Sequence, residues 1–466
     1  MEKLTQEVVP ILILCAAIAI VLRRLPNVSV AHSAEFKRRR VLNWLPLGLT
    51  YAFLYMGRYN LNSLKDTNVI SGATFGDVDA VGSVVYGLAF LINGPLCDRL
   101  GGRKTILLAA AGSAAANAAI AVVIWVQGTP SKMELVLLYA LNMYFQSFGA
   151  VAIVKVNAAW FHIRERGTFG GIFGILISLG LYLAYDWAPK IASWTSTPWL
   201  FMAPALLIGL FFVLSAIWVR DTPAQAGLPD FDVEDASSGD DGPQLRPMQI
   251  VVKLLTNRVI LILAFISLTN GFLRQAVLKW WRSFANGVGL GGSFFVVHWG
   301  MVSCVAGITG GMFAGILSDH FFQSRRPPVA TVLFAIVLCG ALILLGGVVP
   351  GIGFVVAFMA MSVIGINGML SGVASQDFGG RKNAGTATGL IDGFVYFGSA
   401  IQGIVYGHTL PESKLMVDGK LVDNPAVHDI ANWHAWPIAM IPVAVIGLAL
   451  TLTVYNARVK PRASGH

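Results

Sequence analysis

Long apolar runs, separated by short polar or Gly/Pro-rich breaks, follow one another along almost the whole chain. A helix that crosses a bilayer needs about 20 predominantly apolar residues, and runs of this size recur from end to end. Twelve core spans are predicted, beginning near Val41, Asp79, Thr105, Leu135, Thr168, Trp199, Val259, Phe294, Pro328, Gly351, Ala384 and Ala435. The alternating pattern of a membrane β-barrel is absent from the sequence. The pattern therefore predicts an all-α membrane protein.

The spans fall into two sets of six, separated by a polar interruption from Arg220 to Arg246. The acidic, Gly- and Ser-rich core of this interruption is typical of a flexible linker. We therefore predict a six-helix bundle at residues 41–220, a linker at 221–257 and a second six-helix bundle at 258–466. Within residues 1–40, the apolar stretch Val8 to Leu22 favours an extra amino-terminal helix over a helix that lies in the membrane interface.

Composition and charge narrow the class of protein. Hydrophobic residues make up 56% of the chain and charged residues only 12%, which excludes a water-soluble globular protein. The net charge of +9 could suggest nucleic-acid binding, but 22 of the 33 lysines and arginines fall in alternate loops on one side of the predicted spans. This asymmetry follows the positive-inside rule. It predicts a cytoplasmic linker and carboxyl terminus, an amino terminus outside the cytoplasm, and no nucleic-acid partner.

Nothing in the sequence indicates a metal, a cofactor or an enzyme. The four cysteines, Cys15, Cys97, Cys304 and Cys339, lie in or beside apolar runs without paired spacing or histidine neighbours. No nucleotide-binding motif supports ATP-driven transport. The expected partners are the lipid bilayer and a small solute, and the expected state is a monomer.

The two halves share an internal repeat. The loop after the second span runs from Gly94 to Lys104 and contains Asp98, Arg99 and Arg103, while the loop after the eighth contains Asp319. Arg58 precedes the first loop and Arg274 the second, so the order of features is the same in each half. This order is the sign of two bundles related by a pseudo-twofold axis along the membrane normal. We interpret these four loop residues as a conformational latch to neighbouring helix ends; the alternative is a tight turn that carries positive-inside charge.

Arg58 and Arg274 carry the strongest chemical signal. An arginine near the bilayer centre costs at least about 2.5 to 3.5 kcal/mol, so two at comparable depth should face a cavity. The guanidinium stays protonated and offers a planar fork of donors that matches a phosphate or a carboxylate. Two converging forks would suit a phosphomonoester. The alternatives are snorkelling to an interface and pairing with a buried acid.

Four further residues are candidates for the same cavity. Lys155 either lines it or snorkels to the cytoplasmic face, and Asp392 lies near the middle of its span as a counter-ion, a proton site or a contact to a cationic group of the substrate. Tyr59 and Tyr396 stand beside stronger candidates in the sequence. Each could also be a packing residue.

Three segments resemble the organophosphate/inorganic phosphate antiporters of the major facilitator superfamily, which transport glycerol phosphate and hexose phosphate, and a fourth resembles the superfamily in general. The loop from Gly94 is similar to the superfamily signature, with Gly102 where an arginine is usual. The segment RDTPAQAGLP at 220–229, the fourth span from Gln146 to Gly167 and the eleventh span from Ala384 resemble the antiporters themselves. The resemblance implies that Arg58 and Arg274 bind the substrate phosphate. It also implies a bacterial inner (cytoplasmic) membrane.

The chain departs from this family around the predicted site. Phe90 replaces a lysine that is frequent in the second helix, and Ile177 replaces a histidine found in some members. The stretch Ala150 to Ala152 and Tyr59 also differ. The resemblance therefore supports the mechanism more strongly than it supports any one substrate.

The combined prediction is a transporter that exchanges a small organophosphate for inorganic phosphate by alternating access. One alternative is a proton- or sodium-coupled symporter of carboxylates or sugar acids. Another is a membrane sensor of sugar phosphates that binds without net transport. A lipid or drug exporter is less favoured, because such cavities seldom need two arginines.

Overall fold

In the computed structural model, the described residues are 32–162, 166–230, 258–322, 326–369, 375–417 and 420–455, with residues 12, 15, 16, 19 and 256. Most of the predicted amino-terminal helix and most of the predicted linker lie outside them. We call residues 32–230 the N-terminal half and residues 258–455 the C-terminal half.

The N-terminal half is a bundle of long helices. Its elements are α2 (Ala34–Tyr59), α3 (Leu61–Asp66), α4 (Gly72–Leu100), α5 (Gly102–Gln127), α6 (Lys132–Trp160), α7 (Arg166–Tyr182), the π-helix η2 (Leu183–Trp187), α8 (Ala188–Trp194), α9 (Trp199–Trp218) and the 3₁₀ turn η3 (Ala224–Ala226).

The C-terminal half repeats this arrangement and adds a hairpin. Its elements are α11 (Arg258–Gly287), α12 (Phe294–Val297), α13 (Trp299–Ile316), the π-helix η4 (Leu317–Phe321), α14 (Arg326–Leu345), α15 (Ile352–Met369), α16 (Ser375–Thr409), β1 (Lys414–Val417), β2 (Lys420–Asp423), the 3₁₀ turns η6 (Pro425–His428) and η7 (Ile430–Trp433), and α17 (Ala435–Thr453). The antiparallel strands pair Lys414 with Asp423 and Val417 with Lys420.

Each of the twelve predicted spans has a helical counterpart among the described residues, and seven of these helices are long and apolar enough by composition to cross a membrane. Several helices begin earlier than predicted. The first span was expected from Val41, but α2 begins at Ala34 because the Ser33 side chain accepts a hydrogen bond from Phe36 N and caps the helix. Ser71 caps α4 in the same way through Thr74 N, where Asp79 was expected to begin the span. Polar caps extend these helices beyond their apolar cores.

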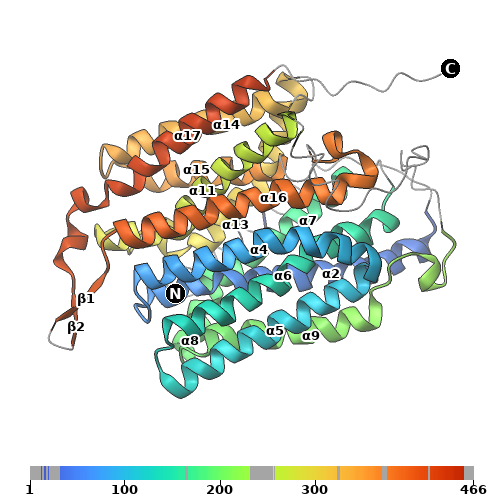
Figure 1. Cartoon of the computed structure of the whole chain (residues 1–466), viewed down its shortest axis with the longest axis horizontal. Helices are drawn as coiled ribbons and strands as arrows, with labels where there is room; N and C mark the ends of the chain where they lie inside the picture. The colour runs from blue at the N-terminus through green and yellow to red at the C-terminus, as the bar shows by residue number, and fades with distance from the viewer. Residues whose placement is uncertain are drawn as a thin grey trace.

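The two halves meet along α4 and α16, which run side by side in Figure 1 between the blue-green and the yellow-red groups of helices. Their contact depends on glycine, since a Cβ added at Gly76 would lie 2.3 Å from the Gly403 carbonyl oxygen. Backbones can approach this closely only where no side chain intervenes. Helices α7 and α13 form a second contact between the halves. These two seams enclose the middle of the molecule.

Candidate functional site

A small cavity of about 120 Å³ lies between the two halves. Helices α2, α4, α6 and α7 of the N-terminal half and α11, α15 and α16 of the C-terminal half all contribute to its wall. The lining residues are Tyr51, Tyr55, Tyr86, Phe90, Ala150, Ile177, Arg274, Asn367, Asp392, Val395 and Tyr396. A cavity at the seam between two repeats is where a transporter of this architecture binds its substrate.

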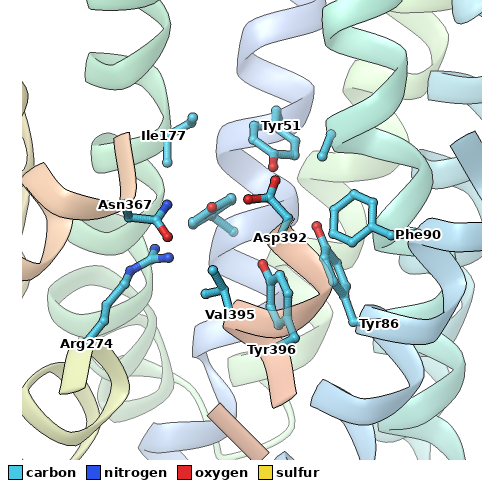
Figure 2. A pocket seen from close by; sticks show the side chains of 11 residues that line it. Tyr51, Tyr86, Phe90, Ile177, Arg274, Asn367, Asp392, Val395 and Tyr396 are labelled. Atoms are coloured by element: carbon cyan, nitrogen blue, oxygen red, sulfur yellow. The ribbon is translucent and has the colours of Figure 1, made fainter. Parts of the chain in front are cut away.

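Arg274, on α11, lines the cavity, as its depth in the predicted span led us to expect. Its side chain is buried, and Nε has no hydrogen-bond partner among the described residues. The guanidinium interacts with the Tyr55 side chain and lies beside Asn367 in Figure 2. A buried guanidinium with an unused donor is suited to bind an anion.

Arg58 lies behind the cavity wall and is not among the lining residues. It is 4% exposed; Nε donates to Gln146 Oε1 at 2.8 Å and Nη1 donates to the Tyr396 hydroxyl at 2.7 Å. Its guanidinium carbon lies 4.8 Å from the ring centroid of Tyr55 and 4.4 Å from that of Tyr86. Three aromatic rings therefore separate this charge from the cavity, and Nη2 has no partner among the described residues.

A buried polar network holds Gln146 against Arg58. Gln146 Nε2 donates to Asn142 Oδ1 at 3.1 Å, and Asn142 Nδ2 donates to the Gly57 carbonyl at 3.0 Å. Ser113 Oγ donates to the same Asn142 oxygen at 2.6 Å. Gln146 Nε2 is held by Asn142, and therefore the amide oxygen on the other side of the same group is directed at Arg58. Sequence reasoning did not place Gln146 in the site. Its four-residue spacing from Asn142, which puts the two side chains on one helix face, is the signal that could have found it.

The other predicted site residues divide between the cavity and its surroundings. Asp392 and Tyr396 line the cavity. Tyr59 lies outside it, where its hydroxyl accepts a hydrogen bond from Gln275 Nε2 at 3.2 Å. Lys155 is exposed on α6 and is also absent from the lining. The structure therefore brings together Arg274, Asp392 and Tyr396, with Arg58 directly behind Tyr396.

Sequence reasoning missed most of the aromatic wall. Tyr51 and Tyr55 are four residues apart on α2, and Tyr86 and Phe90 are four apart on α4. This spacing places each pair on one helix face, which is the signal that could have revealed them. The two rings on α4 meet edge to face at 4.8 Å, and Tyr86 packs on Tyr396 at 4.1 Å.

One end of the molecule is closed by a buried ion pair between the halves. Lys279 Nζ lies 2.6 Å from both Asp79 carboxylate oxygens, and these residues are 6% and 1% exposed. Lys65 Nζ donates to the Lys279 carbonyl at 2.6 Å. Lys279 lies inside α11, because this helix continues to Gly287. From here on, this cluster of Lys65, Asp79 and Lys279 is called the closing pair region.

Two further contacts join the halves at the same end. Asp186, in the π-helix η2, accepts hydrogen bonds from the backbone nitrogens of Gly300 at 2.7 Å and Met301 at 2.9 Å, and so caps the amino terminus of α13. His408 Nε2 lies 2.9 Å from Asp77 Oδ1. The hairpin β1–β2 lies at this end too, at the left of Figure 1.

The predicted latch residues lie near the opposite end. Arg103 Nη2 donates to the Ala216 carbonyl of α9 at 2.6 Å, and its backbone nitrogen donates to Asp221 Oδ1 at 2.7 Å. Arg99 is exposed. The side chains of Asp98 and Asp319 are outside the described part of the structure. These contacts of Arg103, with the end of α9 and with Asp221, lie within the N-terminal half, and the latch stays a prediction.

Comparison with known proteins identifies the family. The model of the Major Facilitator Superfamily matches residues 47–403. The chain belongs to the Major Facilitator Superfamily. Its all-α fold of two helical bundles, expected from the sequence, is thereby confirmed. Among the described residues of this superfamily member, no group of three or more His, Cys, Asp or Glu side chains could hold a metal ion.

The relatives include transporters and a sensor. The chain is 28% identical to the glycerol-3-phosphate transporter of Bacillus subtilis (strain 168), over 90% of this chain and 93% of the relative. It is 26% identical to the membrane sensor protein UhpC of Salmonella typhimurium, over 81% of this chain and 87% of the relative. It is 25% identical to the hexose-6-phosphate:phosphate antiporter of Escherichia coli (strain K12), over 70% of each. These names agree with the family resemblance that the motifs indicated.

Proposed function

We propose that this protein exchanges a small organophosphate for inorganic phosphate across a bacterial inner membrane by alternating access. The observation that carries the proposal is the pair of buried arginines at the seam, one in the cavity wall and one directly behind it, on the corresponding first helix of each half. Named relatives that transport glycerol 3-phosphate or exchange hexose 6-phosphate for phosphate support it.

The contacts of Arg58 suggest how binding drives the cycle. Its bond to the Tyr396 hydroxyl crosses between the halves, from α2 to α16. A phosphate that enters beside Arg274 offers Arg58 a charged acceptor in place of a neutral hydroxyl, and charged hydrogen bonds are the stronger. The anion would then bridge the two halves and remove the repulsion between the arginines. A ligand that prefers one arrangement of the halves shifts the population toward it.

We further propose that the closing pair region lies on the side away from the cytoplasm, so that this conformer faces inward. The distribution of Lys and Arg supports this orientation, since the linker side carries most of the positive charge. It would place the amino terminus outside and the carboxyl terminus inside.

The proposal is tested with purified protein in proteoliposomes. Vesicles loaded with inorganic phosphate, glycerol 3-phosphate, glucose 6-phosphate or lactate are compared for uptake of labelled phosphate, with and without an inward proton gradient. We expect uptake that requires a trans phosphate or phosphoester and needs no proton gradient. Strong uptake driven by the proton gradient alone, and abolished by Asp392→Asn, would reject the antiporter in favour of a proton-coupled symporter.

The similarity to UhpC favours a sensor as the second candidate. A sensor of this kind binds a phosphoester without rapid exchange. Binding measured by protein fluorescence, together with the absence of trans-stimulated uptake in the same preparation, would identify it.

A further inference from the structure

We infer that the organic part of the preferred substrate carries a positive charge: the cavity is built for a compact aminoalkyl phosphate. This inference rests on the proposed function and specifies its substrate class. It follows from the charge balance of the cavity, from its aromatic wall and from its size.

The cavity is electrically balanced, although the sequence predicted two arginines in it. Among its eleven lining residues, the only formal charges are those of Arg274 and Asp392. Arg58 is held behind the wall by Gln146 and Tyr396. A phosphomonoester dianion with a neutral organic group would meet Arg274 and, once Tyr396 releases it, Arg58. These two guanidinium charges balance the dianion, so the Asp392 carboxylate is left without a counter-charge and repels the ligand.

Asp392 lies on the far side of the cavity from Arg274. Figure 2 shows its carboxylate directed toward Tyr51, beside Tyr86, while the Arg274 guanidinium lies beside Asn367 at the opposite side. The described residues form no ion pair with Asp392 within 4.0 Å. Asp392 is half-buried, and a carboxylate that is partly removed from water without an ion-pair partner is destabilised. A cationic group of the ligand would offset this cost. Phosphate at Arg274 and ammonium at Asp392 would match the two ends of the cavity.

The wall around Asp392 is aromatic. Tyr51, Tyr86, Phe90 and Tyr396 line this part of the cavity, and the rings of Tyr86, Phe90 and Tyr396 contact one another. Aromatic faces attract a desolvated ammonium group, and such walls with a carboxylate recognise amines and quaternary ammonium ions. A polyol would gain no comparable attraction from Phe90. The cavity, of about 120 Å³, is small, which favours a compact ester over a bulky one.

The test uses the full chain in proteoliposomes that exchange phosphate for phosphate. Phosphoethanolamine and glycerol 3-phosphate are compared as inhibitors of this exchange and as trans substrates. We expect phosphoethanolamine to inhibit this exchange by half at a concentration at least tenfold lower than that required of glycerol 3-phosphate. Asp392→Asn should raise the half-inhibiting concentration of phosphoethanolamine at least tenfold. It should lower that of glycerol 3-phosphate, because it removes a carboxylate that repels the dianion. Asp423→Asn, on the exposed strand β2, is the matched control and should change neither.

A second variant tests the aromatic wall. Phe90→Leu retains an apolar side chain but removes the ring, so it should raise the half-inhibiting concentration of phosphoethanolamine several-fold more than that of glycerol 3-phosphate. If Asp392→Asn does not fold, the inference is tested by the preference of the wild-type protein for phosphoethanolamine together with the effect of Phe90→Leu. Equal inhibition by the two esters, or equal effects of a variant on both, would overturn the inference. Absence of phosphate exchange with every ester would instead contradict the proposed function, so the two failures are distinguishable.

Discussion

At the residue scale, the two arginines have different surroundings in the present conformer. Arg274 lines the cavity with Nε unused, whereas Arg58 is bonded to Gln146 and Tyr396 and stacked among aromatic rings. We interpret Arg274 as the group that first receives the phosphate and Arg58 as the group that joins when Tyr396 releases it. Both steps depend on the planar fork of the guanidinium, which an ammonium group does not reproduce.

Arg58→Lys and Arg274→Lys should each reduce phosphate exchange at least tenfold. Each substitution keeps the charge but removes donors, and a hydrogen bond to a charged group contributes about 1.5 to 3 kcal/mol. Initial rates of labelled phosphate exchange are the measurement. Arg258→Lys, at the exposed start of α11, is the matched control and should exchange normally. Normal exchange by both site variants would rule out the arginines as phosphate ligands.

The sequence predicted the depth of site residues better than their direction. Arg274, Asp392 and Tyr396 line the cavity, because a polar group deep in a span has few other places to go. Tyr59 follows Arg58 in the sequence and Lys155 lies at an expected depth, but neither side chain lines the cavity. Depth follows from position along a helix, but the angle around the helix is set by packing against neighbours. The aromatic wall and Gln146 were missed for the same reason.

At the scale of elements, the closing pair region joins α4 to α11 through charges that are removed from water. Such a pair contributes little by itself, but loss of one partner leaves a buried charge uncompensated, at a cost of about 3 to 5 kcal/mol. The pair would be exposed to water if the halves separated at this end. Its integrity therefore sets the relative stability of the conformer seen here.

Lys279→Met should favour separation of the halves at this end, because Asp79 can then be hydrated only by opening. Ser83 reports on the seam: it is buried on α4, and its hydroxyl lies 3.1 Å from that of Ser399 on α16. With the native cysteines replaced, Ser83→Cys should react with a thiol reagent at least tenfold faster in Lys279→Met than with Lys279 intact. Adding Asp79→Leu removes the unpaired charge and should restore slow labelling. Equal rates in all three proteins would show that the pair does not hold this end closed.

The number and order of the helices could be predicted from the sequence, but their ends and internal irregularities could not. Apolar length identifies a span, whereas Ser33 and Ser71 extend α2 and α4 through polar residues that hydropathy excludes. The π-helix η2 gives no apolar signal, yet it places Asp186 against the start of α13. The hairpin β1–β2 lies between the last two predicted spans, where no strand was predicted. Such features depend on hydrogen bonds and long-range contacts more than on composition.

At the scale of the whole molecule, the internal repeat predicted two bundles and a site between them. It could not predict which end is closed, because both conformers of an alternating-access cycle use the same sequence. The ends differ in their connections. The hairpin, His408 and Asp186 all lie at the end with the closing pair region, so one topological measurement assigns the side of every one of these contacts.

Cysteine labelling in sealed cells and inverted vesicles provides that measurement. In a background without the native cysteines, of which Cys15 and Cys339 are exposed, Gly239→Cys tests the predicted linker and Asp423→Cys tests the hairpin. The excess of Lys and Arg on the linker side predicts that a membrane-impermeant reagent labels Gly239→Cys only in inverted vesicles and Asp423→Cys only in intact cells. The closing pair region would then lie outside, and the conformer described here would open toward the cytoplasm. Labelling of Asp423→Cys only in inverted vesicles would reverse both assignments, because the hairpin and the closing pair region share one end of the molecule.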